Sequence, residues 1–412
     1  MSYPLWHPFD IFSDVQNLPV THAQGPYLYT LDGRAILDGI SSWWVNIHGH
    51  AHPLIAKAIA AQARKLEQII FAGFSHTPAL DLAHTLCQIL PGKPAKVFFS
   101  DDGSTSVEVA LKMAFQYYYN QGISKKKILA ISGGYHGDTF GAMSVGHRGI
   151  FTRPFHPMLF DVAYIPLPTP DNKELCLNMA EQYLASGEVA AFIYEPLVQG
   201  SAGMLMYPPT NLDALLHLCK SYQVLTIADE VMTGFGRTGT LFASEQGTVH
   251  PDIYCLSKGI TGGFMPLGAT VCPQFIYDAF DIQKPESKFL HGHSYTANPI
   301  ACAAATKSIE MLCSKTGQKN MANTTIQLQA LAQDIKPCNK YHNVRQCGNI
   351  LAFEIKDSTP NEYSSPMSQK LYSYFINHNI LLRPLGNTIY IMPQYIWTDK
   401  EYNIAKNVLL EY

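Results

Sequence analysis

The chain has 412 residues, which is enough for two lobes rather than one minimal core. Apolar residues make up 47% and charged residues 15%, so the composition predicts a large buried core and excludes a disordered chain. The net charge is only -3 at pH 7, which gives no electrostatic reason to expect a nucleic acid or an anionic membrane surface as a partner.

The chain carries no sign of a targeting segment or a membrane anchor. The stretch MSYPLWHPFD has neither the basic nor the apolar region of a secretory signal. No apolar run approaches the ~20 residues that a membrane span needs. The nine cysteines are odd in number and include no C-x-x-C pair, which favours reduced thiols over a disulfide framework. We therefore expect a cytoplasmic protein.

Short apolar runs alternate with amphipathic segments over most of the chain. The segments at 106–120 and 212–223 have helical periodicity, and the apolar runs have the length and composition of buried strands. Strand and helix in alternation predict an α/β fold whose central sheet is mostly parallel and covered on both faces. The expected strands are 96–100, 127–132, 190–197, 224–230 and 252–258.

The last part of the chain differs in character. Residues 296–312 predict a long helix, and residues 343–355 and 387–393 predict strands, so we expect a smaller α+β domain here. The expected division is an N-terminal arm at 1–45 that joins the small domain, a large domain at 46–299 and the C-terminal small domain at 300–412.

The segment DDGSTSVEVALKMA (101–114) follows directly after an expected strand, and its apolar spacing predicts a helix that begins between Ser104 and Ser106. The first N–H groups of a helix can bind an anion, and Gly103 lets a ligand approach the backbone closely. Ser104 or Thr105 adds a hydroxyl. The segment therefore predicts a phosphate site, although on its own an ordinary helix N-cap is the simpler interpretation.

Two charged residues lie at the ends of expected strands. Asp229 ends the strand at 224–230, and Lys258 ends or follows the strand at 252–258. A carboxylate can keep the pyridine nitrogen of a cofactor protonated, and a lysine that is partly deprotonated can form a Schiff base. Either residue alone is more simply solvated or ion-paired. With the phosphate site upstream, the set predicts a cofactor beyond the carboxyl ends of the strands.

Two other motifs are weaker. GFGRTG (234–239) matches the dinucleotide pattern G-x-G-x-x-G, but no helical periodicity follows it and no acidic residue lies about 20 positions on. A nucleotide-dependent dehydrogenase is therefore disfavoured. The histidines of HGHAH (48–52) and HGH (291–293) have no carboxylate or thiolate set beside them, so we expect polar turns and no metal site.

The chain contains, in this order, DDGSTSVEVALKMA, ADEVMTGFGRTG, CLSKGITGG and HGHSYTANPIACAAA. These segments resemble the motifs of the class III aminotransferases, and the resemblance runs from about residue 6 to residue 396. It implies the fold-type I architecture of transferases that depend on pyridoxal 5'-phosphate. The large domain, with its mostly parallel central sheet, would bind the cofactor.

The resemblance also implies roles for single residues. Lys258 would bind the cofactor as a Schiff base and move a proton between substrate and cofactor, and Asp229 would pair with the ring nitrogen. Val231 and Tyr135 would cover the two ring faces, and Tyr135 would also contact substrate. The phosphate would be bound by both subunits of a homodimer, through Gly103 and Ser104 of one chain and through His293 and Ser294 of its neighbour.

Within the family, WHPF, LDGISSWWVNIHGHAHP, GGYHGDTFGAMSV and LLRPLGNTIYIMP are similar to the members that act in biotin synthesis. Those members transfer an amino group from S-adenosylmethionine to 8-amino-7-oxononanoate, which gives 7,8-diaminononanoate. Arg383 would bind the carboxylate of the keto substrate, since its planar guanidinium can bind both oxygens, and Arg237 would support the site. The implied substrate-binding residues are Phe9, Trp43, Trp44, Tyr135, Arg237, Lys258, Gly292 and Arg383.

One position departs from the family pattern. Phe9 stands where the family's WHPY motif has a tyrosine, so a hydrogen bond of ~0.5–1.5 kcal/mol is lost. The departure leaves the amino donor open, and the resemblance implies lysine as the alternative to S-adenosylmethionine, because some members of the family use it. The same motifs also fit a different class III ω-aminotransferase, or a protein that binds the cofactor without catalysis.

Overall fold

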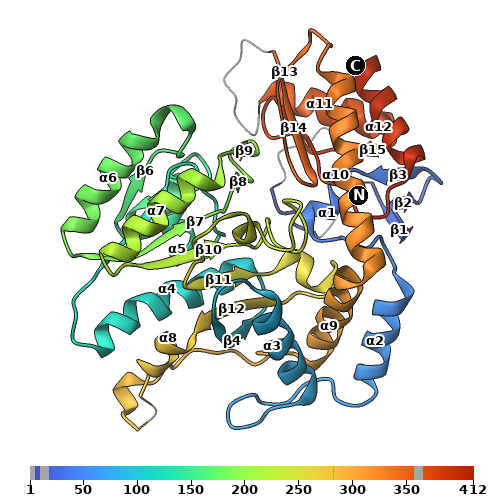
Figure 1. Cartoon of the computed structure of the whole chain (residues 1–412). Coiled ribbons are helices and arrows are strands. Elements are labelled where there is room, and N and C mark those ends of the chain that lie inside the picture. The colour runs from blue at the N-terminus through green and yellow to red at the C-terminus, as the bar shows by residue number, and fades with distance from the viewer. Residues whose placement is uncertain (1–4, 10–17, 282, 357–364) are drawn as a thin grey trace.

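The computed structural model describes residues 5–9, 18–281, 283–356 and 365–412, and a seven-stranded sheet forms the centre of its larger part (Figure 1). The strand order is β4-β12-β11-β10-β7-β5-β6. The strands are β4 (Pro94–Ser100), β5 (Lys127–Ile131), β6 (Val162–Ile165), β7 (Val189–Tyr194), β10 (Leu225–Asp229), β11 (Ile253–Leu256) and β12 (Gly268–Pro273).

The sheet is mostly parallel, as predicted. Strands β11, β10, β7, β5 and β6 pair in parallel, and only β12 is antiparallel to its neighbours β11 and β4. All five strands expected from the sequence form, within a few residues of the expected bounds. Strands β6 and β12 were not predicted.

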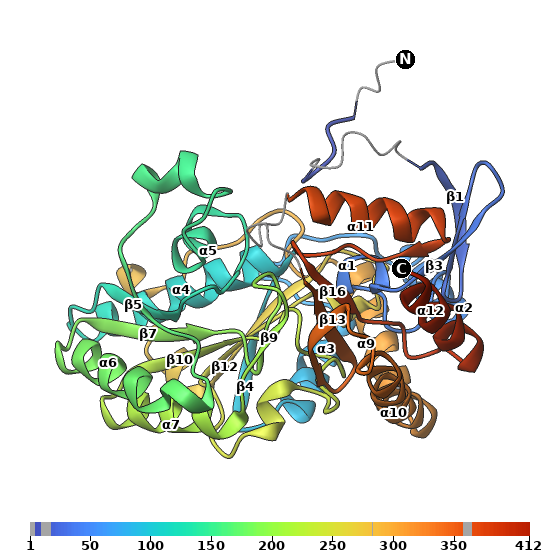
Figure 2. The same cartoon turned by 90° about the horizontal axis from the view of Figure 1, so that it is seen from above.

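Helices cover both faces of this sheet: Figure 2 shows α4 and α5 on one face and α6 and α7 on the other. Alternate strand residues serve the two faces, because Ile128 and Ala130 pack with α4 whereas Leu129 and Ile131 belong to the opposite core. The helices of this part are α2 (Pro53–Ala63), α3 (Thr77–Ile89), α4 (Gly103–Asn120), α5 (Phe140–Val145), α6 (Lys173–Ala185), α7 (Pro209–Ser221), α8 (Gln274–Asp278) and α9 (Pro299–Cys313).

A second hydrophobic core joins the two ends of the chain. Leu37, Ile40 and Trp44 pack there with the C-terminal helices and with the antiparallel sheet β13-β14-β16. A further small sheet has the order β1-β2-β3-β15. The elements are β1 (Val20–Gln24), β2 (Tyr27–Thr30), β3 (Ala35–Asp38), α10 (Lys315–Ile335), β13 (Tyr341–Cys347), β14 (Ile350–Ile355), α11 (Pro366–Asn377), β15 (Ile380–Leu381), β16 (Thr388–Ile391) and α12 (Asp399–Glu411).

The domain boundaries at residues 45 and 299 remain predictions, and α9, just beyond the second of them, packs in the first core. The remaining elements are short: α1 (Ser41–Trp44), β8 (Val198–Gln199), β9 (Leu205–Met206) and the 3-10 turns η1 (Arg153–Met158), η2 (Pro170–Asn172), η3 (Ala243–Gln246), η4 (Lys258–Thr261) and η5 (Pro285–Ser287).

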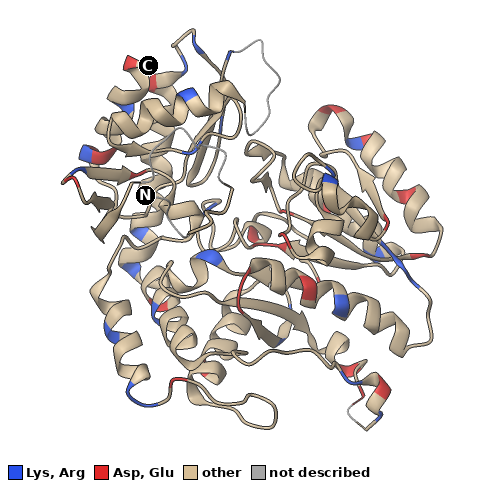
Figure 3. Cartoon of the chain, turned by 180° about the vertical axis from the view of Figure 1, so that it is seen from behind, with Lys and Arg blue, Asp and Glu red and all other residues tan. Residues whose placement is uncertain are grey.

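Charges of both signs are interspersed over the ribbon in the view of Figure 3, which agrees with the near-neutral balance of the sequence. All nine cysteines are free thiols. Among the described helices, none combines the length and the apolar character that crossing a membrane requires.

Candidate active site

A cavity of about 420 Å³ opens at one edge of the central sheet. Five strands deliver residues to it from their carboxyl ends: β5, β7, β10 and β11 run parallel, and β4 shares their direction because both β4 and β11 are antiparallel to β12. This is the edge at which ligands bind in α/β sheets. The wall includes Trp44, Asp102, Gly103, Ser104, Tyr135, His136, Glu195, Asp229, Val231, Met232 and Lys258.

Helix α4 begins at this edge, at Gly103, one residue before the predicted range. Asp102 caps the helix, since its carboxylate accepts from Thr105 N at 2.8 Å, so the ordinary N-cap is present. The cap uses Thr105 N, and the N–H groups available to a ligand at the cavity end of the helix are those of Gly103 and Ser104. A Cβ added to Gly103 would come within 2.7 Å of Val231 Cγ1. The close approach of backbone and Val231 therefore requires glycine at this position.

Ser104 is fixed from a second loop. Its hydroxyl accepts a hydrogen bond from Asp138 N at 3.1 Å. Gly137, with a φ of +127°, makes this possible, because a Cβ there would lie 2.2 Å from Ser104 Oγ. The loop after β5 and the start of α4 are thus joined at the Ser104 hydroxyl, and backbone N–H groups from both surround it.

Asp229 ends β10 and is buried, and two donors orient its carboxylate. Val231 N donates to one oxygen at 3.1 Å, and His136 Nδ1 lies 2.7 Å from the other. Because an ionised carboxylate can only accept, His136 holds a proton on Nδ1 in this contact. His136 was not predicted, although it lies in the GGYHG segment that follows an expected strand.

Lys258 follows β11 and starts η4 with a left-handed φ of +45°. Its amine lies 4.3 Å from the ring centroid of Trp44. Burial lowers the pKa of Lys258 to about 8, against the opposing influence of the Asp229 and Glu195 carboxylates. An appreciable fraction of the amine is therefore neutral, and so nucleophilic, near physiological pH.

Glu195 is a second cavity residue that was not predicted from the sequence. It follows β7, is buried, and its two oxygens accept from Tyr135 N and Gly200 N, both at 2.9 Å. Burial raises the pKa of Glu195 to about 7, and nearby Asp229 acts in the same direction. The residue joins the loop that carries Tyr135 to the loop that follows β7.

Tyr135 and Val231, predicted to cover two faces of a ring, both line the cavity. The Tyr135 hydroxyl donates to Asp138 Oδ2 at 2.9 Å. Burial, followed by the Asp138 carboxylate, raises the pKa of Tyr135 well above its usual range, so the phenol stays protonated. It acts as an aromatic wall and a hydrogen-bond donor.

Trp43 and Trp44 lie in a short left-handed turn. All four residues of α1 have positive φ, with values from 46° to 75°, and none is glycine. Each left-handed L-residue costs roughly 1–2 kcal/mol, so the surrounding structure must hold this turn. Trp44 lines the cavity and donates from Nε1 to the Tyr390 hydroxyl at 3.1 Å.

Trp43 points to a different group of predicted substrate-binding residues. Its ring meets that of Phe9 edge-on at 5.5 Å and lies 5.1 Å from the guanidinium carbon of Arg383. Arg383 Nη2 donates to the Phe9 carbonyl oxygen at 3.1 Å. The structure therefore brings Phe9, Trp43 and Arg383 together, and the turn at α1 links this group to the cavity wall.

Arg237 was predicted both to support the site and to bind substrate, and its contacts in the structure are those of a supporting residue. Its side chain is 1% exposed, and its guanidinium donates to three carbonyl oxygens, those of Pro393 (2.8 Å), Trp44 (3.1 Å) and Asn46 (3.3 Å). It forms no part of the cavity wall. The geometry assigns Arg237 the support of the backbone around Trp44, because a planar fork suits several carbonyls at once.

Gly292, His293 and Ser294 lie on an exposed segment and do not line the cavity of their own chain. His293 Nδ1 lies 3.5 Å from Asp101 Oδ2, and Gln68 Nε2 donates to the Ser294 carbonyl at 2.8 Å. These contacts keep the segment beside the mouth of the site. Its role in the site of a neighbouring subunit stays a prediction.

The histidines of HGHAH have structural partners. His48 Nε2 lies 3.0 Å from the Ser308 carbonyl, His50 Nε2 lies 2.9 Å from Asp38 Oδ2, and His52 caps α2. Within the described ranges, no group of three or more His, Cys, Asp or Glu side chains has the arrangement of a metal site.

The cavity residues fit pyridoxal 5'-phosphate. The N-terminus of α4, where a Cβ at Gly103 would strike Val231, suits a phosphate. Asp229 is a buried carboxylate of the kind that keeps a pyridine nitrogen protonated, and Lys258 is an amine with a lowered pKa. This donor set, on a mostly parallel sheet covered by helices, defines a pyridoxal-phosphate-dependent transferase of fold-type I.

Comparison with known proteins identifies the family. A family model described as "Aminotransferase class-III" matches residues 12–411, and the chain therefore belongs to the class III aminotransferases. Proteins called adenosylmethionine-8-amino-7-oxononanoate aminotransferase are among its relatives. The one from Synechococcus elongatus is 48% identical (97% of this chain, 96% of that protein), and the one from Helicobacter pylori is 39% identical (99% and 95%).

Solved structures of aminotransferases have the same fold as this chain. The crystal structure of the adenosylmethionine-8-amino-7-oxononanoate aminotransferase of Methanocaldococcus jannaschii has a TM-score of 0.93 at 34% identity, over 99% of this chain and 96% of that chain. An amine transaminase from an uncultivated Pseudomonas species, in a PLP-bound form, has a TM-score of 0.92 at 31% identity, over 100% and 98%. The protein is a pyridoxal-phosphate-dependent aminotransferase.

Proposed function

We propose that this enzyme transfers an amino group from S-adenosylmethionine to 8-amino-7-oxononanoate, which yields 7,8-diaminononanoate in biotin synthesis. The relatives that carry this activity in their names match the chain over nearly its whole length. The observation that carries the chemistry is the convergence of Lys258, Asp229 and the start of α4 on one cavity.

Lys258 is the proposed catalytic base and acid. When bound, pyridoxal phosphate supplies an electron sink that stabilises negative charge on the substrate carbon next to the amine. Lys258 Nζ, neutral in part because its pKa is about 8, would take the proton from that carbon of the amino donor and pass it to the cofactor. In the second half-reaction it would move a proton from the cofactor to the carbon of the keto substrate that receives the amine. Asp229, held by His136 and Val231 N, would keep a proton on the ring nitrogen.

The aromatic residues have a positioning role in this proposal. Tyr135 and Val231 would confine the ring plane, and Trp44 would close the side of the cavity next to Lys258. Exclusion of water by these side chains strengthens the electrostatic effect of Asp229 and keeps the amine of Lys258 partly neutral. Gly103 and Ser104 would hold the phosphate through backbone N–H groups and the hydroxyl.

The substrates would be oriented by the group around Trp43. Arg383 is the proposed partner of the carboxylate of 8-amino-7-oxononanoate, and its guanidinium is already set against the Trp43 ring. Phe9 supplies an aromatic edge without a hydroxyl. We expect the choice of amino donor to depend on the group formed by Phe9, Trp43 and Arg383. Lysine is the second candidate donor.

A homodimer with shared sites is part of the proposal. The segments around Gln68 and Ser294 are joined by a hydrogen bond and carry exposed apolar side chains, among them Ile70, Phe74, Leu290 and Tyr295. Such a surface beside the mouth of the site suits a second copy, which would bring its own His293 and Ser294 to the phosphate. We also propose a cytoplasmic location, because the nine cysteines are free thiols and such thiols are typical of reducing compartments.

The visible absorption spectrum of the purified protein with pyridoxal phosphate tests the proposal. S-adenosylmethionine should bleach the band of the lysine-bound cofactor, and 8-amino-7-oxononanoate should restore it. Bleaching by lysine alone would keep the enzyme class and replace the donor. Absence of any cofactor band, even after added pyridoxal phosphate, would overturn the proposal.

A further inference from the structure

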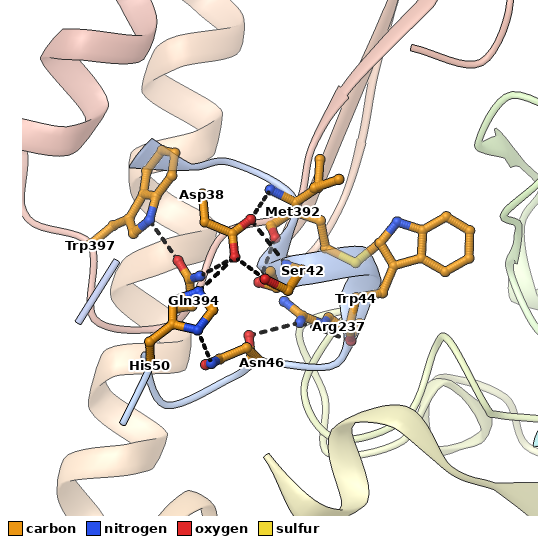
Figure 4. Close-up of polar contacts among 11 residues, drawn as sticks. Asp38, Ser42, Trp44, Asn46, His50, Arg237, Met392, Gln394 and Trp397 are labelled. Atoms are coloured by element: carbon orange, nitrogen blue, oxygen red, sulfur yellow. Dashed lines mark hydrogen bonds and ion pairs between the residues drawn. The ribbon is translucent and has the colours of Figure 1, made fainter. Parts of the chain in front are cut away.

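Asp38 lies at the end of β3, is completely buried, and does not line the cavity (Figure 4). Its carboxylate nevertheless makes an unusually large number of contacts. One oxygen accepts from Ile40 N at 3.3 Å and from Ser42 N at 3.0 Å. The other lies within hydrogen-bond distance of Ser42 Oγ (2.8 Å), His50 Nε2 (2.9 Å) and Gln394 Nε2 (3.1 Å).

The side-chain donors to Asp38 are themselves held in place. Trp397 Nε1 donates to Gln394 Oε1 at 2.9 Å, which directs the amide nitrogen of Gln394 at the carboxylate. Asn46 Nδ2 donates to His50 Nδ1 at 3.1 Å, so the proton of a neutral His50 lies on Nε2, which faces Asp38. Figure 4 shows these side chains grouped around Asp38. The carboxylate is therefore a fixed point that joins the segment at 38–50 to the segment around Gln394, which follows Asp38 by 356 positions.

The same carboxylate holds the left-handed turn of α1. Ser42, bonded to Asp38 through both its N–H and its hydroxyl, has φ 46° and ψ 57°. The other side of the turn is fixed by Ser41, whose hydroxyl donates to Met392 O at 2.8 Å, and by Arg237, which binds Trp44 O. The turn carries the indole of Trp44 to the amine of Lys258 and the indole of Trp43 to Arg383.

We propose that Asp38 is a positioning residue of the aminotransferase: its carboxylate holds the left-handed turn Ser41–Trp44 and thereby sets Trp44 against Lys258. This inference rests on the proposed role of Lys258. Asp38 acts through the turn and not on substrate, because its side chain is shut off from the cavity. Ser42, Gln394 and His50 are its partners, and no glycine in the turn relieves the positive φ values.

Asp38→Asn tests the inference. The amide keeps the shape of the side chain, but only its oxygen can still accept hydrogen bonds, and its NH2 group would face donors. Three measurements are needed: hydrogen exchange of the amides at 40–46 in the cofactor-free protein, the pH midpoint of cofactor capture by Lys258, and kcat and KM. We expect faster exchange at 40–46, an upward shift of the midpoint as Lys258 becomes more hydrated, and a fall of about 10- to 100-fold in kcat/KM.

A second substitution makes the test specific to the turn. Ser42→Gly, added to Asp38→Asn, should recover part of the midpoint shift and of kcat/KM, because glycine takes a positive φ without strain. Asp252→Asn is the control: Asp252 is a partly buried carboxylate that, like Asp38, accepts hydrogen bonds from a backbone N–H and a hydroxyl, here Thr226 N and Oγ1 at the opposite end of β10. It should lower Tm without moving the midpoint.

The outcomes separate the two hypotheses. A wild-type protein without a cofactor band would overturn the proposed function and this inference with it. A functional wild type, with an Asp38→Asn variant whose exchange at 40–46 and pH midpoint are unchanged, would overturn the inference alone. If Asp38→Asn does not fold, Ser42→Ala, which removes only the hydroxyl contact, carries the same measurements with a smaller expected shift.

Discussion

The indole ring of Trp44 lies against the amine of Lys258, with Nζ 4.3 Å from the ring centroid. A ring face attracts a cation and would favour the charged amine. The same ring also removes water from Lys258, and burial is the dominant influence, because the pKa of Lys258 is lowered to about 8. By excluding water, Trp44 therefore helps to lower the pKa of Lys258, so that both the neutral and the charged amine are populated near pH 8.

The lowered pKa predicts how the cofactor-free protein captures pyridoxal phosphate as pH changes. Only the neutral amine is nucleophilic, so the capture rate should rise with pH, pass a midpoint at about 8 and level off above it. Stopped-flow absorbance of the cofactor band measures the rate. A midpoint near the ordinary lysine pKa of about 10.4 would contradict the burial of Lys258 in solution.

Glu195→Gln should move that midpoint to lower pH. The Glu195 carboxylate raises the pKa of Lys258, so its neutralisation removes support for the charged amine. Glu188→Gln is a suitable control, since Glu188 is an exposed carboxylate paired with Lys127 and remote from the cavity wall. The same pH series, run on both variants, should separate them. An upward shift for Glu195→Gln would contradict this prediction.

Gly103→Ala should weaken cofactor binding. The new Cβ would lie 2.7 Å from Val231 Cγ1, and the overpacking should raise the Kd for pyridoxal phosphate by about 10- to 100-fold. Val231→Ala in the same chain removes the clashing methyl groups and should restore part of the affinity. Fluorescence titration of the cofactor-free variants gives both constants. Equal affinity of Gly103→Ala and wild type would show that backbone approach is not limiting.

The shared-site dimer predicts complementation between inactive variants. Lys258→Ala should lose about 10²–10⁴-fold in kcat because proton transfer is lost, and Ser294→Asp should repel the phosphate bound by the neighbouring chain. After mixing and exchange of subunits, mixed dimers should each hold one intact site, which gives about a quarter of wild-type activity. Mixing that recovers no activity, although mass spectrometry detects mixed dimers, would contradict sharing.

Some features of this fold could be read from the sequence because local pattern and burial agree. The strands that end at Asp229 and near Lys258 are continuous apolar runs, and the rule that ligands bind beyond carboxyl ends brought these two residues together. Glu195 and His136 lie beyond the ends of two of these strands, directly after β7 and in the loop after β5. Glu195 was missed because the strand was expected to run on to residue 197, and His136 because it completes no familiar motif.

Other features depend on information that local pattern does not contain. Strand β12 (GATVCP) has the composition of the parallel strands in the same sheet, but the short connection at 257–267 reverses its direction relative to β11. The left-handed turn at Ser41–Trp44 contradicts the preferences of its residues, because it has no glycine. It exists because Asp38, Arg237 and Met392 O bind it, and that is tertiary information.

The anchors of this turn also set the order in which the site can be completed during synthesis. Met392 and Gln394 follow their partners Ser41 and Asp38 by 351 and 356 positions. A nascent chain folds from its N-terminal side as it leaves the ribosome. Strands β10 and β11 can therefore assemble, with Asp229 and Lys258 in place, while the turn has its bonds to Asp38 and Arg237 but still lacks the support of Met392 and Gln394. Trp44 should be fixed against Lys258 only after the segment around residue 394 has emerged, so we expect the nascent enzyme to become competent late in translation.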